Sequence, residues 1–296
     1  MGIGEAFALA SAAAWAVGVI LARQLGAHLP PLALNLLKNA LVLMVLAPVV
    51  LALHAGDWPR LPLRDLLLVL ASGVIGIALA DTLYFRALNE LGAGRMGVIG
   101  NLYSPLVLLL GFIFLDERLG PLQWTGFLLV CGGVLLVSRP PGEWRTQPRH
   151  AVRGTLIGML AIALMAVAIV MIKRTLEDQP LLWVTLLRLA AAMAGLLVLA
   201  AATPLRAHLR FDAAAVPWHR LALAAVVGQG LSMVFWLGGY KYASASVAAI
   251  LNESASVFLV VLAALWLREP LGRRAFVGVL LTFGGIACML LGRATP

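Results

Sequence analysis

The chain has 296 residues, of which 62% are hydrophobic and 12% are charged, and its mean hydropathy is +0.99. A soluble domain is about half apolar and about a quarter charged, so this composition excludes a large aqueous domain and the catalytic machinery that needs one. The formal charge of +9 comes from basic residues scattered through short connections between apolar runs. That pattern is typical of membrane topology signals and not of a nucleic-acid-binding surface.

The apolar runs predict the membrane-spanning elements, because about 20 helical residues cross a hydrocarbon layer of about 30 Å. The first run has no Lys or Arg ahead of it, so we expect a transmembrane helix there and not a cleaved signal peptide. In chain order, the runs predict ten transmembrane helices at about residues 6–25, 31–53, 65–86, 95–115, 121–138, 153–172, 181–202, 219–240, 244–266 and 274–291.

The longest polar connection runs from Ser138 to Arg153 and is rich in Pro and Arg, a composition typical of a solvated linker. It divides the chain into two sets of five helices. We therefore expect a first five-helix repeat at residues 1–139, a polar linker at 140–152 and a second five-helix repeat at 153–296.

The two halves resemble each other in sequence. At an offset of 152 residues, Phe114–Gly120 matches Trp266–Gly272 and Gly132-Gly133 matches Gly284-Gly285; at an offset of 150, Leu36–Lys38 matches Leu186–Arg188. Because each repeat has an odd number of spans, the second half must be inverted in the membrane relative to the first. The sequence therefore predicts an all-α membrane protein made of two inverted five-helix repeats, an architecture of transporters that hold substrate between the repeats.

Particular motifs resemble a known family. These are Ala80–Leu88 (ADTLYFRAL), Leu102–Pro105 (LYSP), Glu117–Leu119 (ERL), the glycines from Gly126 to Gly133, and the stretch from Ala243 to Gly292. They resemble the two EamA repeats of the drug/metabolite transporter superfamily. The resemblance implies a ten-helix carrier in the bacterial inner (cytoplasmic) membrane, often an exporter of amino acids or other small metabolites. The two repeats differ at one of the matched positions, where the first repeat has Lys38 and the second has Arg188.

Four ionisable residues fall deep inside predicted spans: Lys38, Asp81, Arg188 and Glu253. Each costs about 2.5 to 3.5 kcal/mol at the bilayer centre on insertion scales, so each needs a partner or water. Counting residues from the span ends predicts two pairs, Lys38 with Asp81 and Arg188 with Glu253. Such pairs either hold helices together or line the substrate route, where they exchange partners with ligand or proton.

Asp81 and Glu253 are the candidate proton-coupling residues, because an arginine stays protonated whereas a carboxylate can bind and release a proton. If Glu253 keeps an arginine partner, this role fails.

Other polar side chains are candidate substrate contacts. Asn101 occupies the repeat position of Glu253, and Pro105 cannot donate to the Asn101 carbonyl, which predicts either a broken backbone facing a wet cavity or a harmless kink. Asn252 and Gln229 are further candidates, with helix packing as the alternative role.

Aromatic side chains within the spans complete the candidate site. Trp15, Tyr84 and Trp236 are possible cavity walls that stack on a planar or cationic ligand, and Tyr103 is a weaker candidate. Packing or lipid contact is the alternative for each of them.

The function that these features predict is a secondary transporter that exports small organic metabolites, such as amino acids, by alternating access. A multidrug or organic-cation exporter is the alternative, favoured if the carboxylates face a cavity without basic partners. The sequence has no HExxH, GxSxG or GxxxxGK[ST] motif, and its two cysteines lack metal-ligand spacing, so we expect no enzyme, no cofactor, no metal and no direct use of ATP. The expected partners are a small-molecule substrate, the lipid bilayer and protons, with no nucleic acid, and no motif indicates an oligomeric state.

Orientation gives conflicting signals. With a cytoplasmic N-terminus, thirteen basic residues would lie outside and seven inside, which favours the reverse orientation under the positive-inside rule. The family resemblance implies cytoplasmic termini, so both orientations stay open at this point.

Overall fold

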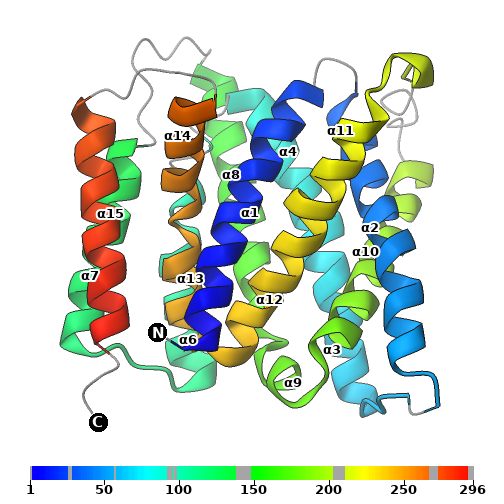
Figure 1. Cartoon of the computed structure of the whole chain (residues 1–296), viewed down its shortest axis with the longest axis horizontal. Helices are drawn as coiled ribbons and strands as arrows, with labels where there is room; N and C mark the ends of the chain where they lie inside the picture. The colour runs from blue at the N-terminus through cyan, green and yellow to red at the C-terminus, as the bar shows by residue number, and fades with distance from the viewer. Residues whose placement is uncertain are drawn as a thin grey trace.

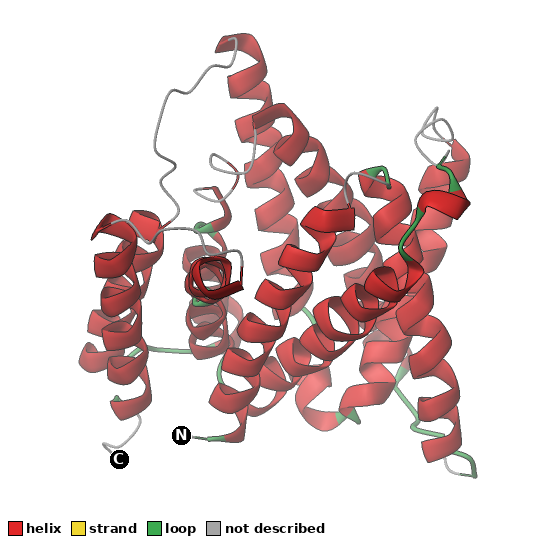
Figure 2. Cartoon of the chain, turned by 45° about the horizontal axis from the view of Figure 1, so that its top comes forward, coloured by secondary structure: helices red, strands yellow, loops and turns green. Residues whose placement is uncertain are grey.

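The computed structural model describes residues 2–25, 29–56, 58–91, 96, 99–137, 148–202, 211–266 and 273–292. Within these ranges every regular element is helical, as Figure 2 shows. Most of the polar linker that the sequence predicts, residues 140–147, lies outside the described residues.

The helices follow the predicted order of spans. The first repeat contains α1 (Ile3–Leu25), α2 (Pro31–Leu53), α3 (Leu63–Gly73) continued by η1 (Val74–Leu79) and α4 (Ala80–Leu91), then α6 (Tyr103–Leu115) and α7 (Pro121–Val137). The second contains α8 (Pro148–Val170), the short α9 (Lys173–Asp178), α10 (Leu181–Ala202), the turn η3 (Ala213–Ala215), α11 (Trp218–Leu223) continued by η4 (Ala224–Leu231) and α12 (Ser232–Tyr242), then α13 (Ala245–Asn252), α14 (Ala255–Trp266) and α15 (Arg273–Leu291).

Length and composition support the membrane assignment. Six helical segments are long and apolar enough to cross a bilayer, and four shorter apolar helices occupy the remaining predicted spans. The sixth span begins at Pro148 and not at 153, because proline fits the first turn of a helix, where no intrahelical partner for its missing N–H is needed. In Figure 1, α1 begins and α15 ends at the lower end of the bundle, as an even number of crossings requires.

Helices pack across the two repeats and not only within them. The first span, α1, lies against η4 and α12 of the eighth, and its counterpart α8 lies against η1 and α4 of the third. Small residues allow these crossings: Gly18 meets Gly228, and a Cβ on Gly76 would lie 2.8 Å from the Cβ of Ala168. The same contact therefore occurs twice, as expected for two repeats related by a pseudo-twofold axis.

The third and eighth spans each contain a π-helical segment at the same repeat position. These segments are η1, which contains Gly76, and η4, which contains Gly228. A π-helical stretch widens the helix locally and is frequent at functional sites. Here both lie at close crossings between the two repeats.

The fifth and tenth spans form a peripheral pair at the left of Figure 1, in which α7 packs mainly against α15. A Cβ on Gly126 would lie 2.7 Å from the carbonyl oxygen of Gly285. Of the aligned glycines, Gly133 and Gly285 lie in the contact between these two helices, whereas a Cβ on Gly132 or Gly284 would meet nothing within 4 Å.

Candidate functional site

Two spans break at equivalent positions inside the bundle. The fourth span turns at Asn101-Leu102 before α6 begins, and the ninth turns at Glu253-Ser254 between α13 and α14. A break at Asn101 was one of the two outcomes expected from Pro105. A break at Glu253 was not expected, because Val257 occupies the repeat position of that proline. Broken helices expose backbone groups at membrane depth, where protein or water must satisfy them.

One carboxylate satisfies a group freed by the first break. Glu253 Oε1 accepts a hydrogen bond of 3.2 Å from the backbone nitrogen of Ser104, in the first turn of α6. A negative charge at a helix N-terminus is favourable because the N–H groups there lack intrahelical partners. The contact joins the two breaks, while the Nδ2 atom of Asn101 is buried without a hydrogen-bond partner.

Aromatic side chains connect these breaks to Arg188. The hydroxyl groups of Tyr103 and Tyr240 lie 2.8 Å apart, and the Tyr240 ring makes an edge contact with Trp236 at 5.1 Å between centroids. The Cζ atom of Arg188 lies 5.0 Å from the centroid of the Trp236 ring. We call Tyr103, Arg188, Trp236 and Tyr240 the aromatic-arginine cluster; it is built from α6, α10 and α12.

Arg188 is 2% exposed, and its Nε and Nη1 atoms have no hydrogen-bond partner. Glycines of the third span make room for it: the Arg188 backbone packs on Gly73, and a Cβ on Gly76 would lie 2.9 Å from its Nη2 atom. The guanidinium is thus enclosed by the third span and Trp236.

The structure corrects the predicted ion pairs. Within the described residues, neither Lys38 with Asp81 nor Arg188 with Glu253 lies within ion-pair distance. Asp81 is instead within electrostatic range of both Lys38 and Arg188. Depth counting placed Lys38 near Asp81, although not at ion-pair distance. It misplaced Arg188 because it paired charges within a repeat, whereas α10 packs on α3 and η1 of the other repeat.

The remaining predicted residues divide into two groups. Tyr84, on α4, lies within electrostatic range of Asp81 near the cluster. Gln229 donates to Asn39 at 3.1 Å, Asn252 donates to its own helix at the Ala248 carbonyl, and Trp15 is 42% exposed. The structure therefore does not bring these last three predicted residues into the cluster.

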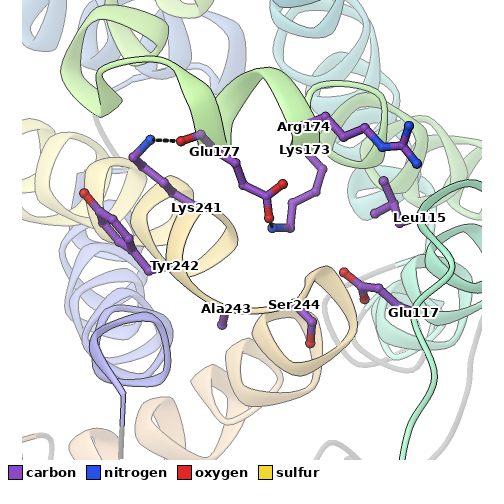
Figure 3. A pocket seen from close by; sticks show the side chains of 9 residues that line it. All are labelled: Leu115, Glu117, Lys173, Arg174, Glu177, Lys241, Tyr242, Ala243 and Ser244. Atoms are coloured by element: carbon purple, nitrogen blue, oxygen red, sulfur yellow. Dashed lines mark hydrogen bonds and ion pairs between the residues drawn. The ribbon is translucent and has the colours of Figure 1, made fainter.

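A pocket of about 380 Å³ lies at the end of the bundle where α1 begins, between α6, α9 and the α12–α13 connection. Figure 3 shows the charged side chains that line it, from Glu117, Lys173, Arg174, Glu177 and Lys241. Lys173 pairs with Glu177 on α9.

Three side chains around this pocket tie neighbouring helices together. Glu117 accepts from the backbone nitrogens of Ala245 and Ser246 at 2.6 and 2.8 Å and from the Ser246 hydroxyl at 2.7 Å. Lys241 donates to three carbonyls at the C-terminal end of α9, at 2.6 to 2.8 Å, and Arg174 donates to the Phe114 carbonyl of α6. We call these contacts of Glu117, Arg174 and Lys241 the end latch; each places a charge at the helix terminus that favours it.

Sequence reasoning missed Tyr240 as a full candidate and missed the end latch. Tyr240 follows Trp236 by four residues, so the two share a helix face, and this spacing could have included it. Glu117 was used only to align the repeats, although a carboxylate after one helix is a common cap for the start of another.

Comparison with known proteins decides the family. The sequence profile of the EamA-like transporter family matches residues 2–139 and 152–291, which is nearly the whole chain. The chain belongs to the EamA-like transporter family. It is therefore an integral membrane transporter, and the two matched segments are its two repeats.

Relatives agree with this assignment. This EamA-like transporter is 30% identical over 135 residues to an uncharacterized transporter of Sinorhizobium, spanning 45% of this chain and 94% of that protein. It is 29% identical to an uncharacterized protein of Pseudomonas aeruginosa over 88% of this chain and 85% of that one. The threonine/homoserine exporter RhtA of Escherichia coli is 30% identical over 141 residues, 46% of this chain and 43% of RhtA. A crystal structure described only as that of a protein matches with a TM-score of 0.79 and 20% identity over 98% of each chain, which shows a shared fold.

Proposed function

We propose that this EamA-like transporter is a secondary carrier that exports small organic metabolites, such as amino acids, across the bacterial inner membrane by alternating access. The metabolite binds at the aromatic-arginine cluster, and the two repeats move relative to each other to open the cluster to one side at a time. Protons are the proposed coupling ion.

The observation that carries this proposal is the contribution of both repeats to one polar region inside the spans. Tyr103 of the first repeat and Tyr240 of the second share a hydrogen bond, and Glu253 of the second caps the break in the fourth span of the first. A movement between the repeats must change these contacts. A ligand bound among them is therefore coupled to that movement.

The end latch supports the alternating-access part of the proposal. Glu117 joins the first repeat to α13 of the second, and Arg174 joins α9 to α6. Together these bonds hold the repeats against each other at the end where α1 begins. We propose that this end is closed in the present conformation and that the latch opens when the carrier changes state.

The metabolite class is supported by one relative. RhtA is named as a threonine/homoserine exporter, and it shares 30% identity with about half of this chain. The rival class, organic cations, is less well supported at Asp81, which lies within range of two basic side chains, whereas Glu253 accepts from the Ser104 backbone and has no arginine partner among the described residues.

The proposal is tested by counterflow in proteoliposomes that contain the purified full-length protein. Vesicles are preloaded with an amino acid, a nucleoside, a polyamine or a quaternary amine, and entry of the labelled compound is measured with and without a pH gradient. We expect entry of at least one amino acid that depends on the protein and responds to the gradient. Entry of quaternary amines alone would replace the proposal with the organic-cation exporter, and no entry of any compound would contradict a carrier.

A further inference from the structure

Arg188 has an unusual electrostatic position within the described part of the chain. Its guanidinium is almost fully buried, and neither Nε nor Nη1 donates a hydrogen bond. A buried N–H without an acceptor costs about 1 to 3 kcal/mol, and more in a charged group. The Trp236 face at 5.0 Å offsets part of this cost, but an aromatic ring does not replace an anionic acceptor.

The tyrosine pair beside Arg188 adds a further donor. When two hydroxyl groups share one hydrogen bond, one of them donates and the other keeps its own O–H for another acceptor. Tyr103 and Tyr240 form such a pair, and both lie within electrostatic range of Arg188. The cluster therefore has N–H donors on the Arg188 guanidinium and an O–H donor on one of the two tyrosines that lack an acceptor among the described residues.

The nearby charges do not supply that acceptor. Asp81 lies five residues beyond Gly76 along the third span, which is about 7 Å of axial rise. Its carboxylate also interacts electrostatically with Lys38. Glu253 uses one oxygen to accept from Ser104. Lys38, Asp81, Arg188 and Glu253 together are formally neutral, so it is the unsatisfied donors of Arg188, and not an excess of positive charge, that favour an anionic group here.

We propose that a carboxylate of the transported metabolite is the missing partner of Arg188, bound by its guanidinium and by the spare hydroxyl of the Tyr103–Tyr240 pair. The proposal rests on the carrier function above and specifies its substrate class as carboxylates, with or without an amino group. Arginine suits this role because its planar donors match the two oxygens of a carboxylate. Nε and Nη1 are closed to water in this conformation, so the carboxylate enters as the guanidinium and the Trp236 ring separate.

The test compares each acid with its own amide, which removes the negative charge and keeps the size. The probes are L-threonine with L-threoninamide, and L-lactate with L-lactamide, measured as thermal stabilisation of the full-length protein in detergent and as counterflow in proteoliposomes. We expect the acids to stabilise the protein and the amides not to do so. Arg188→Gln weakens the apparent affinity for the acids by at least about tenfold, which corresponds to loss of one charged hydrogen bond.

Three further variants keep the test decisive if Arg188→Gln does not fold. Arg188→Lys retains the charge but loses the planar donors, so we expect it to prefer acid over amide less strongly than the native protein does. Arg86→Gln removes an exposed arginine that pairs with Glu90 and leaves the preference unchanged. Acid binding also alters tryptophan emission in the native protein and not in Trp236→Phe.

Equal binding of acid and amide, or an unchanged acid preference in Arg188→Gln and Arg188→Lys, would overturn the assignment. Its failure is distinguishable from failure of the carrier. Acids that bind through Arg188 but never cross the bilayer would contradict transport alone. Transport that ignores both the acid group and Arg188 would contradict this inference alone.

Discussion

Beside Arg188, the hydroxyl of Tyr103 in the first repeat shares a hydrogen bond with the hydroxyl of Tyr240 in the second repeat. Tyr240 is fully buried, so its hydroxyl depends on Tyr103 for a partner. A buried polar group that loses its partner costs about 1 to 3 kcal/mol.

Tyr240→Phe is therefore expected to lower the melting temperature of the protein and to weaken substrate binding by about tenfold, because the Tyr103 hydroxyl loses its partner and the cluster loses a donor. The matched control is Tyr242→Phe two residues on, whose side chain is 48% exposed. Melting curves and counterflow measure both variants. A Tyr240→Phe protein that matches Tyr242→Phe in both assays would show that the hydroxyl pair has no such role.

Glu253→Gln separates the structural role of this side chain from proton coupling. Glutamine keeps an oxygen that can accept from Ser104 but cannot bind and release a proton. We expect Glu253→Gln to fold and to exchange substrate across the membrane at near-native rates, while its transport no longer responds to a pH gradient. Asp81→Asn is the comparison, and if only Asp81→Asn removes the pH response, the coupling residue is Asp81.

Single residues were only partly predictable from sequence. Asp81, Arg188 and Glu253 stood out because charges inside apolar runs are costly, and the structure places all three inside the spans. Their partners could not be read from depth along a helix, since depth gives no information on which helices are neighbours. Gln229 and Asn252 were also candidate substrate contacts, yet Gln229 donates to Asn39 of α2 and Asn252 donates to a carbonyl of its own helix.

At the scale of helices, adjacent glycines have opposite environments. In α15, a Cβ on Gly285 would lie 2.7 Å from the Gly126 carbonyl oxygen, whereas a Cβ on Gly284 would meet nothing within 4 Å. The packing of α7 against α15 therefore depends on only one glycine of this pair.

Gly285→Ala is expected to destabilise the protein by about 1 to 3 kcal/mol, because the added methyl group forces the two helices apart. Gly284→Ala is expected to be neutral or to stabilise by about 0.5 to 1 kcal/mol, because alanine favours helix over glycine. Thermal unfolding of the two variants side by side is the measurement. Equal destabilisation by both would mean that helix propensity and lipid contact outweigh the α7–α15 contact.

The elements themselves were largely predictable, because runs of about 20 apolar residues define spans. At Asn101, Pro105 removes a donor, which indicated an irregularity there but left a break and a harmless kink as alternatives. The break at Glu253 was not predictable, because no proline marks it, and neither were the π-helical segments η1 and η4. Such features depend on packing between distant segments and not on local sequence.

At the scale of the whole molecule, the end latch joins the two repeats at one end of the bundle. Glu117 is its most connected carboxylate, with three hydrogen bonds to the first two residues of α13. Loss of the Glu117 hydrogen bonds should change the balance between the closed and open conformations at this end of the bundle without removing the binding site.

Glu117→Gln is expected to reduce the transport rate by about tenfold or more, because the amide can accept fewer of these bonds and carries no charge at the start of α13. Substrate affinity should change little. Asp116→Asn is the matched control, since this neighbouring side chain is exposed and its backbone is left-handed at φ 58°, a conformation that asparagine tolerates. Counterflow rates equal to those of Asp116→Asn would contradict a gating role for the latch.

The inverted architecture was predictable from the internal repeat, because five spans per half require inversion. The packing of α1 on the eighth span and of α8 on the third was not, because sequence similarity between halves does not say whether they are separate or interlocked.

That interlocking also constrains how the protein is made. While the chain is being synthesised, α1 gains most of its contacts only when the eighth span (α11, η4 and α12) enters the bilayer, and α7 gains most of its contacts from the last helix, α15. The glycine-lined faces of the early helices must meanwhile contact lipid or insertion factors. Neither half can complete its own packing, so a nascent chain that stops after the fifth helix would be an assembly intermediate and not a small folded protein.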